Sequence, residues 1–154
     1  MFKINVILNN IKWKYYLKRP NNYIENKIKS INKKKKLHKK KTIFCTLLLS
    51  GNDEIKRLNK KFRNKDKSTD VLSFPFYEKK EFKNKINKEK EIYIGDIIVN
   101  INKINEKKNI KNFRLEFDKL WIHGLVHLLG YDHKKNKDFL NMLKVEKKFL
   151  SFLN

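Results

Sequence analysis

The chain has 154 residues, of which 40% are hydrophobic, which excludes a fully disordered polymer and predicts one domain, residues 1–154, with a single buried core. Its formal net charge is +23, and the first 50 residues alone hold 14 Lys and Arg against one Glu. Such a charge favours polyanionic partners. Part of it can reflect AT-rich codon usage, because Lys, Asn and Ile dominate the whole chain.

Cysteine usage and hydropathy indicate the compartment. Cys45 is the only cysteine, which excludes an internal disulfide and a thiolate zinc cluster and fits a reducing cytosol. The longest apolar run, residues 42–49, is far shorter than the ~20 residues of a membrane helix. The start of the chain has no apolar block ending in small residues, as a targeting segment would. We therefore expect a soluble, cytoplasmic protein with no membrane partner.

The first 50 residues predict two strands with a helix between them. Residues 2–8 alternate imperfectly between apolar and polar and predict a strand. Apolar residues then recur at helical spacing over residues 23–31. The helix leads into residues 33–41, mostly lysine, which we expect to be exposed and mobile because like charges repel. Residues 42–50 predict a buried strand.

The middle of the chain predicts a helix, two strands and a charged loop. The helix is expected to begin at residues 51–53 and to turn three apolar side chains inward, namely Ile55, Leu58 and Phe62. Residues 70–76 predict a strand, and Pro75, which has no N–H to donate, favours an edge or a strand end. Residues 78–90, nearly all Lys, Glu and Asn, predict a loop, and residues 91–100 predict another strand.

The last third predicts two helices. Residues 115–129 are apolar nearly all round towards their end, which is typical of a buried helix, and Gly130 is suited to end it in a left-handed conformation. A final amphipathic helix is expected to present six apolar side chains on one face: Phe139, Met142, Leu143, Phe149, Leu150 and Leu153. Strands and helices do not alternate strictly, so we expect an α+β fold with a mixed sheet of about four strands.

The stretch HGLVHLLGYDH, residues 123–133, holds three of the four histidines. On a helix, His123 and His127 lie one turn apart and point to the same side, and a reversal at Gly130 would let His133 approach the same point. Three neutral imidazoles with bonds of about 2.0–2.1 Å form a good zinc site, although nickel or copper would also suit them. Two imidazoles buried in an apolar helix would otherwise both need polar partners, so we predict one bound Zn²⁺.

The predicted metal site has no evident fourth protein ligand, which favours a catalytic zinc over a structural one. Asp132 adjoins His133 but can equally accept a bond from an imidazole N–H. His38 lies within the lysine run, where we assign it no role.

Gly124 stands where the zinc-protease motif H-E-x-x-H has its glutamate general base. The histidine spacing therefore resembles a protease site from which the base is missing. Two explanations for the glycine remain open. It can leave room beside the metal for a bulky substrate group, or it can allow the helix to pack closely against a neighbour.

Four segments, in order, resemble the YbeY family of metal-dependent endoribonucleases, over nearly the whole chain. The histidine stretch is similar to that family's H-G-x-x-H-L-x-G-Y-D-H signature. Residues 58–76, LNKKFRNKDKSTDVLSFPF, resemble its L-N-x-x-[FY]-R and T-[DN]-V-L-S-F-P segments. Residues 94–100, IGDIIVN, resemble its Gly-Asp-Ile strand, and Met142 with Glu146 resembles its closing M-x-x-x-E.

The resemblance implies that His123, His127 and His133 bind zinc and that Arg63 is the basic residue of the active-site groove. It also implies a single-strand-specific endoribonuclease that acts in 16S ribosomal RNA 3′-end maturation and ribosome quality control, with ribosomal RNA and the small subunit as partners. The chemistry agrees, because a metal and a guanidinium would both stabilise the negative charge that develops on phosphoryl oxygens. Without the resemblance, Arg63 would read as a solvated arginine at a helix end.

Several side chains near the motifs carry weaker expectations. Asn59 can hold substrate or cap local backbone, and structural roles are favoured for Asp70 and Ser73. Glu146 is expected at the surface or as a partner of a metal ligand rather than as a base. Two alternative functions stay open: a zinc metallopeptidase, which the histidine spacing favours and Gly124 opposes, and a non-catalytic ribosome-associated protein with structural zinc.

Overall fold

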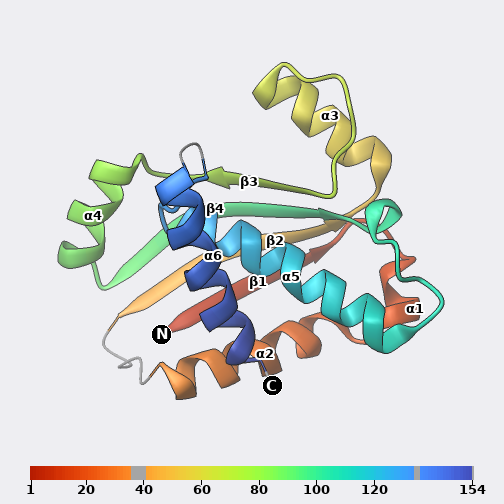
Figure 1. Ribbon diagram of the computed structural model, residues 1–154, viewed down its shortest axis with the longest axis horizontal. Helices are drawn as coiled ribbons and strands as arrows, with labels where there is room; N and C mark the ends of the chain where they lie inside the picture. Colours follow the sequence, from red (N-terminus) through yellow and green to blue (C-terminus); the bar gives the residue numbers. More distant parts are fainter. Residues whose placement is uncertain (36–40, 134–135, 154) are drawn as a thin grey trace.

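The computed structural model describes residues 1–35, 41–133 and 136–153, which form a four-stranded sheet flanked by helices (Figure 1). The strands are β1 (Phe2–Leu8), β2 (Thr42–Ser50), β3 (Val71–Pro75) and β4 (Glu91–Asn100), in the spatial order β1-β2-β4-β3. β1, β2 and β4 are parallel, whereas β3 pairs antiparallel with β4 at the edge of the sheet. The predicted α+β class, the mixed sheet and the edge position of Pro75 are confirmed.

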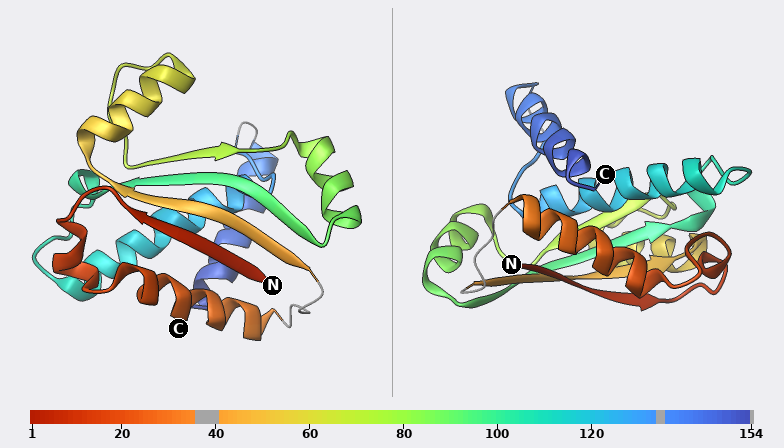
Figure 2. Two further views of the ribbon diagram at one scale, coloured as in Figure 1. Left: turned by 180° about the vertical axis from the view of Figure 1, so that it is seen from behind. Right: turned by 90° about the horizontal axis from the view of Figure 1, so that it is seen from below.

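One face of the sheet carries most of the helices. α2 (Pro20–Lys34) packs along β1, α5 (Ile110–Leu128) packs across β3 and β4, and α6 (Asn136–Ser151) lies on α5 as an outer layer (Figures 1 and 2). The short helices α1 (Trp13–Leu17) and α4 (Lys79–Lys88) lie at opposite ends of the sheet, and a 3-10 turn (Ile101–Lys103) follows β4. α3 (Asn52–Arg63) packs against the other face.

The core between the sheet and α5 fixes the helix that carries the histidines. Phe113, Phe117, Trp121 and Leu125 recur every fourth residue along α5 and are fully buried. At its start, Asn109 accepts hydrogen bonds through Oδ1 from the backbone N–H groups of Lys111 (2.9 Å) and Asn112 (3.2 Å), a typical N-cap. A helix held along one whole face in this way is a rigid support for side chains on its other face.

A second, smaller apolar cluster lies on the opposite face of the sheet. Ile55 of α3 packs there with Leu72 of β3 and Ile98 of β4, and all three are buried. Leu58 is half-buried beside them, whereas Phe62, predicted to point inward, is 59% exposed. The first turns of α3 therefore pack closely on the sheet, and its last turn projects outward (Figure 1), so that there only the side chains of Phe62 and Arg63 reach β3.

Three helices differ from the sequence prediction. The predicted loop at residues 78–90 contains α4, because Phe82 and Ile86, one turn apart, give an otherwise charged segment one apolar stripe that packs on the core. α1 was not predicted, and it forms around Trp13 and Leu17, which are also one turn apart and buried. α5 begins at Ile110 instead of Leu115 because its cap is Asn109.

The final helix is confirmed, but its inward face is narrower than predicted. Met142, Phe149 and Leu153 are buried, whereas Phe139 is 51% exposed. His38 and most of the lysine run, residues 36–40, lie outside the described residues. Within the described ranges, the helices are all too short or too polar to cross a membrane.

Candidate metal centre and active-site cleft

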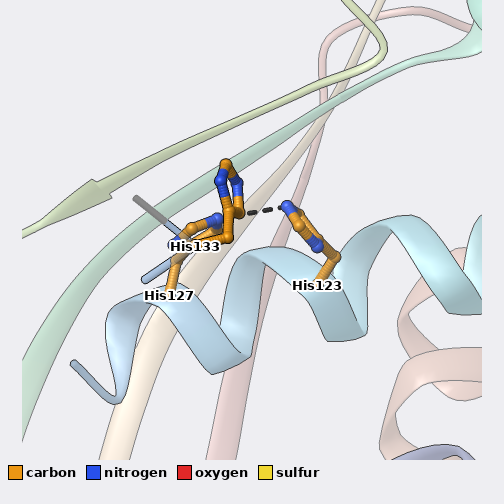
Figure 3. Close-up of side chains that lie close together, drawn as sticks. All are labelled: His123, His127 and His133. Atoms are coloured by element: carbon orange, nitrogen blue, oxygen red, sulfur yellow. Dashed lines mark hydrogen bonds between the residues drawn. The ribbon is translucent and has the colours of Figure 1, made fainter. Parts of the chain in front are cut away.

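α5 presents two histidines on the side that faces away from the core. Ile122, Leu125 and Val126 surround them in sequence and are fully buried, while His123 and His127 are each half-buried. The two imidazoles lie one turn apart, as predicted, with 3.1 Å between their Nε2 atoms (Figure 3). Two ligand atoms of a tetrahedral zinc ion lie roughly 3.3 Å apart when each bond is about 2.0–2.1 Å, so this spacing fits a shared metal.

The end of α5 brings in the third histidine. Gly130 has a φ of +88°, a left-handed conformation that a residue with a Cβ rarely adopts, and its N–H donates to the carbonyl of His127 at 2.9 Å. The chain reverses there, and the ring of His133 comes to 5.0 Å from that of His127 and 5.8 Å from that of His123, centroid to centroid (Figure 3). One ligand atom from each histidine lies within 4.8 Å of the others. The predicted convergence is therefore present.

Hydrogen bonds to the outer ring nitrogens orient the two helical imidazoles. Glu146 of α6 places Oε1 2.7 Å from Nδ1 of His123, and the carbonyl oxygen of Tyr131 lies 3.0 Å from Nδ1 of His127. When Nδ1 donates to these oxygens, each Nε2 keeps its lone pair for a metal. Burial, with the nearby His123, lowers the pKa of His127 to about 4, so this imidazole is neutral at pH 7. The donor set fits a zinc ion.

Arg63 lies across a cleft from the histidines. Its Nη2 donates to the carbonyl oxygen of Ser73 at 2.9 Å, and Cζ lies 5.5 Å from the centroid of the Phe74 ring. Arg63, His127 and His133 all line one cleft of about 820 Å³. The structure thus brings the predicted basic residue and the predicted ligands, about 60 residues apart in sequence, to a shared space.

The walls of this cleft include residues that sequence reasoning did not single out. Lys65 and Lys79 add positive charge, Glu78 adds negative charge next to the already predicted Asp132, and Phe76 adds an exposed aromatic ring. Lys79 belongs to α4, which was predicted as a loop, so the pattern offered no way to place it. Phe76 was predictable only as the end of an edge strand.

Gly124 points away from the cleft and into the sheet. A Cβ built on it would lie 2.6 Å from Cγ2 of Ile97, a fully buried residue of β4. Ile97 therefore fills the space that the glycine leaves. The idea that Gly124 makes room for substrate beside the metal is wrong, and the alternative of close helix packing holds.

The remaining candidate residues mainly support local structure. Asn59 is buried and its Nδ2 donates to the carbonyl of Lys67 at 2.8 Å, which favours the local-backbone role. Asp70 accepts the N–H of Val71, and Asp132 accepts the N–H of His133, both at 2.8 Å. Glu146 contacts His123, as expected for a partner of a metal ligand.

The fold and the site together define a class: a small α+β domain whose last sheet-packed helix, with the turn that follows it, carries a three-histidine candidate metal centre, and an arginine lies across the cleft. The profile of the family described as Endoribonuclease YbeY matches residues 7–154. The chain belongs to this family.

Individual relatives agree with this assignment. The chain is 43% identical to the Endoribonuclease YbeY of Pelagibacter ubique, covering 99% of this chain and 97% of that one. It is 35% identical to that of Fusobacterium nucleatum, over 85% and 80% of the two chains. The solution structure of a Thermotoga maritima protein superimposes with a TM-score of 0.60 at 32% identity, covering 98% of this chain and 89% of the other.

Proposed function

We propose that residues 1–154 act as one domain that cleaves single-stranded RNA with one Zn²⁺ held by His123, His127 and His133. The observation that carries this proposal is the cleft itself, which joins the three-histidine cluster to Arg63. Membership of an endoribonuclease family supports RNA as the substrate. The net charge of +23 supports binding of a polyanion.

Each protein group has a defined task in this proposal. Zinc, when bound, supplies Lewis-acid chemistry at the scissile phosphate. Arg63 donates to the phosphoryl oxygens on which charge develops, and its planar guanidinium can bridge two of them. The carbonyl of Ser73 and the ring of Phe74 hold that guanidinium at the cleft. Glu146 keeps His123 in the tautomer and orientation of a ligand.

We further propose that the physiological substrate is the 3′ end of the small-subunit (16S) ribosomal RNA, in maturation and quality control of the ribosome in the cytoplasm. The four motif segments that resemble the family support this role. The corresponding test is cleavage of a precursor RNA that carries the mature 3′ end, with the cut positions mapped against a scrambled sequence of equal length. Equal cleavage of both RNAs would contradict a specific maturation role.

The two alternative functions make different predictions in a single set of assays. We expect zinc-loaded protein to cleave a single-stranded RNA and to leave casein intact, because the peptidase glutamate is replaced by Gly124. Chelation should abolish RNA cleavage and leave the far-ultraviolet circular dichroism largely unchanged. Casein cleavage without RNA cleavage would favour the peptidase, and unfolding on chelation would favour a structural zinc.

A further inference from the structure

The face of the sheet opposite α5 is only partly covered. α3 packs on one end of it, through the cluster of Ile55, Leu72 and Ile98. Over the other end, near the starts of β2 and β4, the described residues place no helix, and the strands lie open in the back view (Figure 2). A parallel sheet is normally covered on both faces, so an open end made of such strands is a candidate binding surface.

A row of aromatic side chains crosses this open end. The strand register sets Lys3 of β1 beside Phe44 of β2, and Phe44 beside Tyr93 of β4. The Phe44 and Tyr93 ring centroids are 5.3 Å apart, and that of Phe76, just after β3, is 5.6 Å from Tyr93. Phe44 is 37% exposed and Phe76 63% exposed, so these rings are not part of the core. We call Phe44, Tyr93 and Phe76 the aromatic row.

The aromatic row begins at the cleft. Phe76 lines the same cleft as Arg63 and His127 and also contacts Tyr93 edge to face. Its backbone N–H donates to the carbonyl of Ile94 at 3.0 Å, which extends the β3–β4 pairing by one residue and holds the ring at the rim. A chain that leaves the cleft past Phe76 therefore reaches Tyr93 and then Phe44 as it crosses the sheet.

We propose that the aromatic row is a base-stacking platform for the single-stranded RNA that flanks the cleavage cleft. This inference rests on the proposed function, since it takes RNA as the occupant of the cleft. Aromatic rings on an open sheet bind successive bases by stacking, which is tolerant of sequence, while nearby cations hold the backbone. Lys3 is exposed at the far end of the row, where it can meet a phosphate.

The polar neighbours of the row fit stacking. The hydroxyl of Tyr93 donates to Oδ1 of Asp96 and lies 3.2 Å from Oγ1 of Thr46, so the ring, not the hydroxyl, is presented to a ligand. Burial and the Asp96 bond raise the pKa of Tyr93 to about 12, so the phenol stays neutral beside a polyanion. The Asp96 carboxylate accepts the hydrogen bond of the Tyr93 hydroxyl and repels phosphates near the ring. The bases, rather than the phosphates, are therefore expected to contact the aromatic row.

The test compares variants of the full-length, zinc-loaded protein that keep or remove the ring at position 44. Phe44→Leu keeps an apolar side chain without a π-face, and Phe44→Tyr keeps the ring. Tyr15→Leu is the matched control, because Tyr15 is 78% exposed on α1, and α1 lies at the opposite end of the sheet from α4 (Figure 1), whose Lys79 lines the cleft. Affinity for a labelled single-stranded RNA dodecamer is measured by fluorescence anisotropy, next to an abasic oligomer with the same number of phosphates. Thermal melting of each variant checks its fold.

A tryptophan probe reports stacking directly. Trp13 and Trp121 are fully buried, so Phe44→Trp adds an exposed fluorophore whose quenching reflects contact with bases. We expect Phe44→Leu to weaken binding of the dodecamer by about tenfold, with Phe44→Tyr and Tyr15→Leu close to wild type. The dodecamer should quench the fluorescence of the indole introduced by Phe44→Trp, whereas the abasic oligomer and heparin should not.

The outcomes separate this inference from the proposed function. Unchanged affinity in a folded Phe44→Leu variant, or quenching as strong with heparin as with RNA, would overturn the platform. If wild-type protein cleaves RNA while either of these results appears, the endoribonuclease proposal stands and the platform alone fails. If RNA quenches the probe and is never cleaved, the platform stands and the catalytic proposal fails.

Discussion

The two walls of the cleft are built in different ways. On the histidine wall, His123 and His127 project from a helix whose opposite face is buried along its whole length, and each ring has a hydrogen-bond partner at Nδ1. On the arginine wall, Arg63 is the last residue of α3, whose end projects from the sheet, and its guanidinium is held by one carbonyl and one aromatic ring.

This contrast indicates that the histidine wall is rigid and that the arginine wall can adjust its position. A metal site needs ligand atoms held to within a few tenths of an ångström, which the packing of α5 provides. A guanidinium that binds the phosphates of a flexible polyanion does not need such exact placement, but its side chain must be long enough to follow them. We therefore expect changes on the histidine wall to act through the metal, and changes on the arginine wall to act on turnover with the metal in place.

The largest effect is expected from removing a ligand. His127→Ala should abolish stoichiometric zinc binding and lower RNA cleavage by more than the ~10²–10³-fold that loss of one charge-stabilising group costs. The fold should persist, since the His127 ring is half-buried at the rim and alanine favours a helix. Metal content is measured by atomic absorption alongside cleavage rates. His38→Ala is the control, and wild-type zinc content and activity in His127→Ala would refute the site.

A large effect without metal loss is expected on the other wall. Arg63→Ala should lower kcat/KM by about 10²-fold while zinc content and melting temperature stay the same, because only the charge opposite the metal is lost. Arg63→Lys should recover part of the rate because it restores the positive charge. The recovery should be incomplete, because the ammonium group cannot bridge two phosphoryl oxygens as a guanidinium can. Arg57→Ala, on the exposed surface of the same helix, should behave as wild type. If zinc content fell in Arg63→Ala, the two walls would not be independent.

A smaller effect is expected from the residue that orients a ligand. Glu146→Gln should weaken zinc binding by roughly 10–100-fold, because the carboxylate that holds Nδ1 of His123 loses its charge. Activity should return when zinc is raised, whereas the His127→Ala deficit should not. Zinc titration with a competing chelator measures the affinity, and Glu25→Gln on the surface of α2 is the control. An unchanged affinity would show that the 2.7 Å contact adds nothing to metal binding.

The sequence predicts the strands better than the helices, for a physical reason. Continuous apolar runs identify β2 and β4, because these inner strands lie between two neighbours and bury many side chains. α4 was missed because two apolar residues, Phe82 and Ile86, suffice to dock a helix whose other positions are charged. The prediction that Phe62 points inward is wrong, because helical spacing indicates which side chains share a face of a helix but not where along its length the helix stops packing on the sheet.

The histidine cluster could be predicted from the sequence, and the cleft could not. The three histidines lie within eleven residues, so helix periodicity and the reversal of the chain at one glycine are enough to bring their side chains together. Arg63 reaches them only through the pairing of β3 with β4 and the packing of α5 on both, which no local pattern encodes. Glu146 is similar, since its contact with His123 depends on how α6 crosses α5.

Gly124 gives the smallest and sharpest test, because it lies between the ligands yet faces the other way. Gly124→Ala places a methyl 2.6 Å from Cγ2 of Ile97, and this overpacking should lower the free energy of unfolding by about 1–3 kcal/mol. The higher helix propensity of alanine should offset ~1 kcal/mol of that loss. Cleavage per folded molecule should stay near wild type, because the cleft is untouched. Denaturant unfolding and active-site-normalised rates measure the two quantities.

A double-mutant cycle isolates the packing contact. Ile97→Ala alone should cost roughly 2–5 kcal/mol by leaving a cavity, and the new methyl of Gly124→Ala would occupy part of it. The double variant should therefore be more stable than the sum of the two single changes predicts, by the roughly 0.5–3 kcal/mol that is typical of contacting residues. The opposite result would be that the unfolding free energies of the two single variants add up in the double variant and that folded Gly124→Ala loses turnover. It would show that Gly124 acts at the cleft and not in packing against Ile97.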